Sequence, residues 1–208
     1  GRTADADAGL ATLDRAFERM PAAVELLTLL RSHQALLALF AEILGSAPRL
    51  SKVVALHPHV LDAVIDPAFA STSLDADDVT ARVRSIVGQP PPSVEDGLDR
   101  MRDAARQENF LVGARLLSGT LSPQRAGQGY AAVAEACIRV ALEDVRRAFV
   151  ADHGTVPEAE VVVLGLGRLG AGELTATSDL DLVVLYDRPA DAEASSGPRP
   201  LDPVTYHV

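Results

Sequence analysis

Two aspartates near the end of the sequence, Asp179 and Asp181, stand at the mouth of the apolar run Leu180–Tyr186 and could act together. Because side chains along a strand alternate between its two faces, residues two apart point the same way. Paired carboxylates are costly among apolar residues unless a cation or hydrogen bonds satisfy them. Mg²⁺ prefers oxygen ligands and is often held by one or two carboxylates together with substrate phosphates. We therefore expect Asp179 and Asp181 to bind a divalent metal, Mg²⁺ or Mn²⁺.

A glycine-rich turn precedes the two aspartates. The short β-branched run Val161–Leu164 predicts a buried strand, and Gly165, Gly167 and Gly170 follow it directly. Backbone N–H groups of such a turn, and of a short helix after it, can hold phosphate oxygens. The order of strand, glycine turn, loop and acidic strand is therefore the order that a phosphate-handling site requires.

Three interpretations of this segment compete. In the first, the acids are solvated residues at a sheet edge, because a lone D-x-D is common. In the second, Gly165–Gly170 is a G-x-G-x-x-G dinucleotide fingerprint and Asp187 is its ribose-binding acid. Against this, Thr175–Ser178 forms helix poorly, and acids are unusual in a central parallel strand. In the third, which we favour, the segment is a nucleotidyl-transfer site.

The sequence GLGRLGAGEL followed by SDLDLVVLYD closely resembles the glutamine synthetase adenylyltransferase family, a branch of the polymerase-beta-like nucleotidyltransferases. The family block reads G-[KR]-L-G, an acid-hydrophobe pair and S-D-[LI]-D-L. Its matches here are Gly167, Arg168, Leu169, Gly170, Glu173, Leu174, Ser178, Asp179, Leu180 and Asp181. The segment Leu26–Pro67 resembles the family's helical lead-in, and His153-Gly154 resembles the turn before its strand. The resemblance thus spans most of the chain.

The resemblance implies an enzyme that moves AMP between ATP and a tyrosine of glutamine synthetase, and so controls nitrogen assimilation. Asp179 and Asp181 would hold the metal, while Gly165, Gly167, Arg168, Gly170 and Ser178 would contact the nucleotide. The implied partners are glutamine synthetase and, through the parent chain, a nitrogen-signalling regulatory protein.

Family members carry one domain that adds AMP and one that removes it by phosphorolysis. Ser195–Leu201 resembles the S-D-G-x-R-P-L of the adenylylating half, although Ser196 replaces the aspartate. The third family carboxylate has no counterpart here, so we expect a fragment that is inactive alone. The alternative is a non-catalytic helical docking module with a degenerate nucleotide site.

Two other polar features favour ordinary roles, and a third, Arg168, has two roles open to it. Cys137 is the only cysteine, and its helical surroundings predict a small core residue in a reducing compartment. His57 and His59 flank Pro58 without other ligands at metal spacing, which favours a capping or surface role. Arg168 could reach a phosphate, or it could form an ion pair with Glu173.

Composition narrows the class of protein. The chain has 208 residues, 48% of them hydrophobic, and its formal net charge is −10. A nucleic-acid partner demands basic surface, so we expect none. We see neither an apolar run near 18 residues nor a signal peptide, and we expect a cytoplasmic protein without membrane contact.

The expected fold class is α+β and predominantly α-helical. A helical domain (residues 1–120) should be followed by the opening portion of a polymerase-beta-like nucleotidyltransferase domain (residues 121–208), whose long helix should pack on the sheet. Periodicity, caps and breakers predict helices over Gly9–Arg19, Ala22–Arg31, Gln34–Leu44, Arg49–Leu56, Asp62–Asp66, Asp75–Val87, from Ser93 to about Ser118 and from Pro123 to about Asp152. Arg188–Val208 is proline-rich, and we expect it to be mobile.

Overall fold

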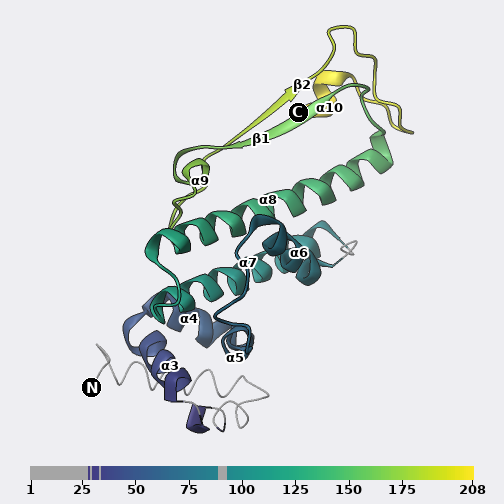
Figure 1. Cartoon of the computed structure of the whole chain (residues 1–208). Coiled ribbons are helices and arrows are strands. Elements are labelled where there is room, and N and C mark those ends of the chain that lie inside the picture. Colours follow the sequence, from purple (N-terminus) through teal and green to yellow (C-terminus); the bar gives the residue numbers. More distant parts are fainter. Residues whose placement is uncertain (1–27, 29, 33, 89–92) are drawn as a thin grey trace.

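Helices dominate the computed structural model, which describes residues 28, 30–32, 34–88 and 93–208 (Figure 1). The larger helices are α3 (Gln34–Ser46), α4 (Pro48–Leu56), α6 (Ala76–Val87), α7 (Val94–Leu117) and α8 (Pro123–His153), and η1 (Pro58–Leu61) and α5 (Asp62–Ile65) are short. The predicted α+β, mainly helical class is confirmed. The helix predicted over Gly9–Arg19, and most of that over Ala22–Arg31, lie outside the described residues. None of the helices within the described ranges has the length and hydrophobicity needed to cross a membrane.

The two longest helices begin where their capping residues predict. The Ser93 side chain accepts a hydrogen bond from the backbone N–H of Asp96 at 3.0 Å, and α7 starts at the next residue. Ser122 caps α8 in the same way, and Pro123 occupies its first turn. Gly154 ends α8 with φ of +71°, a conformation that glycine adopts without strain.

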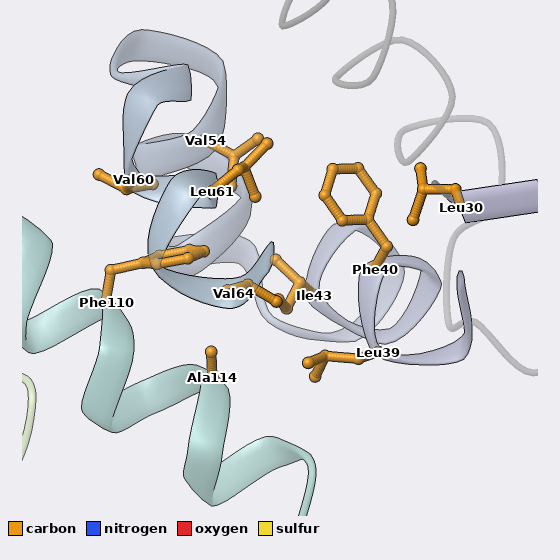
Figure 2. Packing of buried hydrophobic residues seen from close by; sticks show 10 residues of the cluster. All are labelled: Leu30, Leu39, Phe40, Ile43, Val54, Val60, Leu61, Val64, Phe110 and Ala114. Carbon is orange, nitrogen blue, oxygen red and sulfur yellow. The ribbon is translucent and has the colours of Figure 1, made fainter. Parts of the chain in front are cut away.

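A first hydrophobic core joins the N-terminal helices to the middle of α7 (Figure 2). Ile43 of α3, Val54 of α4 and Phe110 of α7 are almost fully buried in it. Figure 2 shows Phe110 and Ala114 on one turn of α7, pointing into this cluster. Burial of these apolar side chains therefore holds the N-terminal helices against α7.

The long helix α8 packs against α6 and α7. Val79 and Val83 of α6 meet Ala104 of α7, and Ala136 and Val140 of α8 complete the cluster. In Figure 1 the strands lie on the opposite side of α8. A hollow of about 410 Å³ separates α8 from them. Helix α8 thus stands between the other helices and the sheet. The domain boundary expected between residues 120 and 121 stays a prediction.

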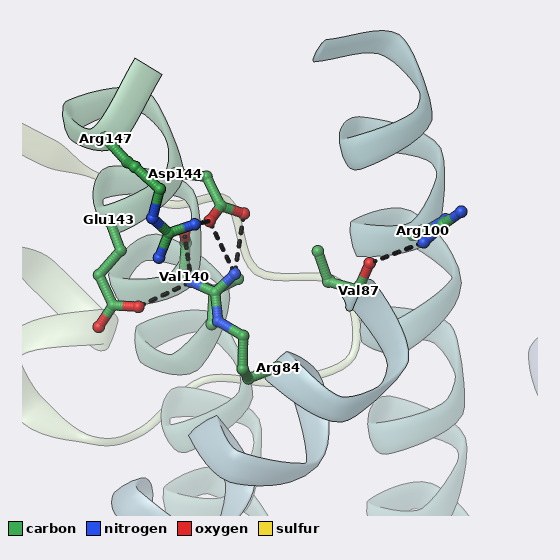
Figure 3. A network of polar contacts seen from close by, with 7 residues as sticks. All are labelled: Arg84, Val87, Arg100, Val140, Glu143, Asp144 and Arg147. Atoms are coloured by element: carbon green, nitrogen blue, oxygen red, sulfur yellow. Dashed lines mark hydrogen bonds and ion pairs between the residues drawn. The ribbon is translucent and has the colours of Figure 1, made fainter. Parts of the chain in front are cut away.

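An arginine of α6 ties that helix to α8 (Figure 3). Arg84 donates to both carboxylate oxygens of Asp144, at 2.7 and 2.9 Å, and to the carbonyl oxygen of Val140 at 3.1 Å. Glu143 accepts a further bond from Arg84, and Arg147 donates to Asp144. The paired guanidinium and carboxylate are only 15% exposed, so they are screened less than a surface pair would be.

Beyond α8 the chain forms a two-stranded antiparallel sheet. Strand β1 (Glu160–Gly165) pairs with β2 (Leu182–Asp187), with Gly165 opposite Leu182. The predicted strand at Val161–Leu164 is confirmed, but its predicted burial is wrong, since Val162 is 48% exposed and Leu164 41%. The sheet consists of these two strands alone in the described part of the chain, and a hollow lies between it and α8 in place of packed side chains.

The C-terminal segment contacts the end of α8, although we expected Arg188–Val208 to be mobile; its mobility stays a prediction. Gly197 and Arg199 donate their backbone N–H groups to the carbonyl oxygens of His153 and Asp152, at 2.9 and 3.0 Å. The Arg199 guanidinium also pairs with the Asp152 carboxylate. The last residues form α10 (Pro203–His207).

Candidate nucleotide and metal site

The site is assembled at the end of the hairpin where β1 leaves the sheet. Leu166 follows β1, and α9 (Gly167–Ala171) begins at once after it. The backbone N–H of Leu166 donates to the carbonyl oxygen of Asp181 at 2.8 Å, which continues the pairing by one step beyond Leu182. Asp179 and Asp181 therefore precede β2 and are not strand residues as we expected, although the fold brings the Asp181 carboxylate to Gly167 of the glycine turn. Both side chains are exposed.

Gly167 lies directly against one of the two acids. Its φ is +52°, in the region that favours glycine. A Cβ atom at this position would lie 2.9 Å from Oδ2 of Asp181, closer than such contacts normally are. The absence of a side chain at Gly167 is thus what lets the Asp181 carboxylate approach the turn.

Gly165 and Gly170 permit close packing between β1 and α9. A Cβ on Gly165 would lie 2.9 Å from Cγ of Leu169. A Cβ on Gly170 would overlap the carbonyl oxygen of Gly165. Both glycines are therefore explained by the short distance between strand and helix, and their contact with a nucleotide stays a prediction.

The other predicted contact residues differ in their surroundings. Arg168 is exposed, and its guanidinium makes no ion pair with Glu173 or any other residue in the described part of the chain. Ser178 accepts a hydrogen bond from the backbone N–H of Thr175 at 2.9 Å, which closes the loop. Ser178 thus supports the loop that carries Asp179, while Arg168 is left available for an anion.

The loop between α9 and β2 is held on the helices. Leu174 is 5% exposed and packs with Val112 of α7 and with Ala126 and Tyr130 of α8. A Cβ on Gly127 would touch the backbone of Glu173 at 3.4 Å, so glycine allows this approach. Sequence reasoning noted Leu174 only as part of a motif. A single large apolar side chain in an otherwise polar loop was the signal in the sequence that could have predicted this packing of the loop on the helices.

The donor set fits a hard divalent cation. Asp179 and Asp181 offer only carboxylate oxygens, and both side chains are exposed, so a cation and its water ligands can reach them. In the part of the chain that the structure describes, no group of three or more His, Cys, Asp and Glu side chains could hold a metal. Two carboxylates leave most positions around Mg²⁺ for water and substrate phosphates, which is how this ion is usually bound.

The dinucleotide interpretation is wrong. A dinucleotide fold needs parallel strands joined by a crossover helix, because the ligand sits at the carboxyl ends of such strands. Here β1 and β2 are antiparallel, and α9 between them has 5 residues. The G-x-G-x-x-G spacing arises from tight packing of a short helix on β1, as described above.

Comparison with known proteins points in one direction. The sequence model of the family described as glutamate-ammonia ligase adenylyltransferase matches residues 37–208. The chain is 42% identical over 208 residues to a bifunctional glutamine synthetase adenylyltransferase/adenylyl-removing enzyme of Mesorhizobium japonicum, covering 100% of this chain and 21% of the relative. Enzymes of the same description from Brucella suis and Xanthobacter autotrophicus are 40% and 42% identical over 206 residues, covering 99% of this chain and 21% of each relative. The chain therefore spans about a fifth of the length of these curated relatives.

Proposed function

This chain belongs to the glutamate-ammonia ligase adenylyltransferase family, and on that premise we propose that it forms part of an enzyme that transfers AMP from ATP to glutamine synthetase. The acceptor in this proposal is a tyrosine hydroxyl, and the enzyme acts in the cytoplasm to control nitrogen assimilation. The relatives are named for both addition and removal of the adenylyl group. Ser195–Leu201 supports the adenylylating half for this chain.

One observation carries the proposal: the Asp181 carboxylate lies against Gly167 at the start of α9. An acid held at a glycine turn places a metal-binding oxygen beside backbone N–H groups that suit phosphate. Antiparallel pairing produces this arrangement, because it folds the segment before β2 back onto the residues after β1.

Each residue has a defined part in the proposed reaction. Asp179 and Asp181 hold Mg²⁺ or Mn²⁺, and the bound ion would neutralise charge on the triphosphate. Arg168, which has no ion-pair partner among the described residues, would contact a phosphate. Burial of Leu174 anchors the loop that leads to the acids, which would limit the movement of the carboxylates before the substrate binds.

Two carboxylates do not complete the site in this proposal. Deprotonation and alignment of a tyrosine hydroxyl need a further acidic group, and the described residues offer no three-ligand cluster. We therefore propose that the chain binds metal–nucleotide but transfers no AMP alone. A nitrogen-signalling regulatory protein would act through the remainder of the whole enzyme.

Nucleotide binding tests the proposal directly. Titration calorimetry with Mg²⁺–ATP should detect binding by the unsubstituted chain. Asp181→Asn should weaken it on the order of tenfold or more, because a charged contact is lost. The matched control is Asp187→Asn, which removes an exposed aspartate at the far end of β2 and should change little. Equal affinities in the two variants would contradict the assignment.

Transfer of labelled AMP tests the second half of the proposal. The chain, incubated with labelled ATP, Mg²⁺ and glutamine synthetase, should leave the synthetase unlabelled. A protein of the relatives' full length should label it, and Asp179→Ala in that protein should remove the label. Efficient labelling by the short chain would show that its own residues complete the active site.

A further inference from the structure

A second hollow lies between α4 and α7, away from the two aspartates. Its volume is about 610 Å³. One wall is the face of α4 that carries Arg49, Lys52 and Leu56, and the opposite wall is the face of α7 with Arg106 and Phe110. On each helix these residues are three or four positions apart, so they share one face. The two faces lie on opposite sides of the hollow.

The charge of this pocket is unusual for an acidic chain. Arg49, Lys52, His57 and Arg106 line it, and no carboxylate does. Three other hollows each include at least one acid: Asp66 and Glu108 in one, Glu135 in the second and Glu42 in the third. In a chain with net charge −10, a pocket lined by three permanent cations and no acid calls for a negatively charged occupant.

The cations of the pocket are poorly neutralised by the protein. Within the described residues, Arg49 and Lys52 form no ion pair. Arg106 approaches the Asp103 carboxylate only to 3.8 Å, and the same carboxylate already contacts Nε2 of His59 at 3.1 Å. One acid thus serves two basic groups, and the exposed side chains of Arg49 and Lys52 have no acidic partner among the described residues.

His57 reports the resulting local potential. Its pKa is lowered from 6.5, first because burial disfavours the charged ring, and then because Arg106 and His59 repel an added proton. Asp103 acts in the opposite direction and does not cancel these effects. An anion in the pocket would reverse the repulsion.

We propose that the hollow between α4 and α7 binds a small oxyanion with two or more negative charges. Arginine forms paired hydrogen bonds to carboxylate and phosphate groups, and lysine adds a point charge. Leu56 and Phe110 add apolar wall beside the position of such a ligand. Free phosphate compounds and polycarboxylates share this chemistry.

Ala176 connects this pocket to the candidate site. It lies in the loop between α9 and β2, and it contributes to the wall of the hollow. The same loop leads through Ser178 to Asp179. A ligand held by α4 and α7 would therefore touch the loop that positions the acid pair, and it would stabilise that loop.

Titration calorimetry without divalent metal tests the binding, because the acid pair then has no part in it. Pyrophosphate and citrate are the two probes. Arg49→Gln with Arg106→Gln should weaken binding on the order of a hundredfold. The charge-matched control, Arg102→Gln with Arg125→Gln, removes two exposed arginines elsewhere and should change affinity less than about threefold. Asp181→Asn should leave pyrophosphate binding intact, which separates this proposal from the nucleotide site.

The outcomes are decisive in either direction. Binding of pyrophosphate alone identifies a phosphate compound, and binding of both probes identifies a general polyanion pocket. Binding of neither probe, or equal loss in the pocket and control variants, would overturn the proposal. A hexa-aspartate peptide that binds when neither small anion does would instead identify a protein partner, and would also overturn it.

Hydrogen exchange gives an independent readout. Pyrophosphate should slow amide exchange in the loop at Thr175–Thr177 of the unsubstituted chain, because Ala176 lines the pocket. The slowing should be absent in the double variant of Arg49 and Arg106. Unchanged loop exchange despite tight binding would place the anion elsewhere and contradict the assignment.

Discussion

The backbone N–H of Leu166 and the carbonyl oxygen of Asp181 are hydrogen-bonded at 2.8 Å, beyond the last paired residues of the two strands. This bond fixes the residue before α9 to the second acid of the D-x-D motif. It therefore sets the distance between the glycine turn and the carboxylate without any ligand. The proposed nucleotide site is a consequence of strand pairing, and its side chains are added to a preformed backbone.

Substitution of Gly167 by alanine tests that arrangement. The new Cβ would lie 2.9 Å from Oδ2 of Asp181, so the carboxylate must move. Gly172→Ala is the matched control, because its φ of +68° is similar and nothing lies within 4 Å of its Cβ position. Both variants should lose about 1 kcal/mol of stability from backbone strain.

Nucleotide binding should separate these two glycine variants. Calorimetric affinity for Mg²⁺–ATP should fall on the order of tenfold in Gly167→Ala and stay near that of the unsubstituted chain in Gly172→Ala. Equal affinities would show that the Gly167–Asp181 contact has no part in binding.

The Arg84 network should contribute measurably to stability. Arg84→Met removes both bonds to Asp144, whose side chain is 15% exposed, and leaves its carboxylate with Arg147 alone. We expect a loss of about 2 kcal/mol in urea denaturation. Arg102→Met breaks an exposed pair with Asp99 and should cost less than about 0.5 kcal/mol. Similar losses in both variants would mean that the partly buried network stabilises the fold no more than an exposed ion pair does.

The anchoring of the C-terminal segment depends on Gly197. A Cβ there would overlap the backbone of His153 and Gly154, so Gly197→Ala should detach the segment from α8. Amide exchange at Gly197 and Arg199 should then accelerate on the order of tenfold or more, because their bonds to α8 are lost. Gly119→Ala, at an open position, should not affect these amides. Unchanged protection in Gly197→Ala would contradict the anchored conformation.

Cys137 should be an unreactive thiol. Burial and the nearby Glu108 carboxylate raise its pKa from 9.0 to about 11. Iodoacetamide at pH 8 should therefore modify the folded chain about a hundredfold more slowly than the unfolded chain, with the rate rising as the pH increases. The raised pKa also affects stability. The thiol of the unfolded chain ionises at lower pH than the folded one, so the free energy of unfolding falls as the pH rises from 9 towards 11. Rapid alkylation at pH 8 would show that Cys137 is a reactive residue.

Local signals in the sequence predicted the helices well. Ser93, Ser122 and Gly154 mark helix ends through contacts within a few residues. The starts of α7 and α8 and the end of α8 therefore follow from the local sequence. The pair of Arg84 and Asp144 joins residues far apart in the chain, and no local pattern indicates it. No local pattern indicates the contact of Gly197 with His153 either, so the proline-rich composition of the segment was interpreted as a sign of mobility.

The candidate site was predicted in part. The order of strand, short helix and second strand was confirmed, and the structure adds that Asp181 lies beside Gly167; the role of these residues in a nucleotide site stays a prediction. The exact start of β2 was wrong, because pairing with β1 decides where a strand begins and apolar runs do not. Gly170 could be recognised as special, but its reason, contact with the carbonyl oxygen of Gly165, required the folded backbone.

The central claim is that Asp179 and Asp181 hold the metal of a metal–nucleotide complex at the glycine turn. Paramagnetic Mn²⁺–ATP, added in small amounts to the isotope-labelled chain, tests it most directly, because Mn²⁺ broadens NMR signals of nearby nuclei. We predict that the amide signals of Gly167, Asp179 and Asp181 broaden first, and that Asp181→Asn abolishes this broadening while Asp187→Asn does not. Broadening centred on other acids, or unchanged in Asp181→Asn, would contradict the claim.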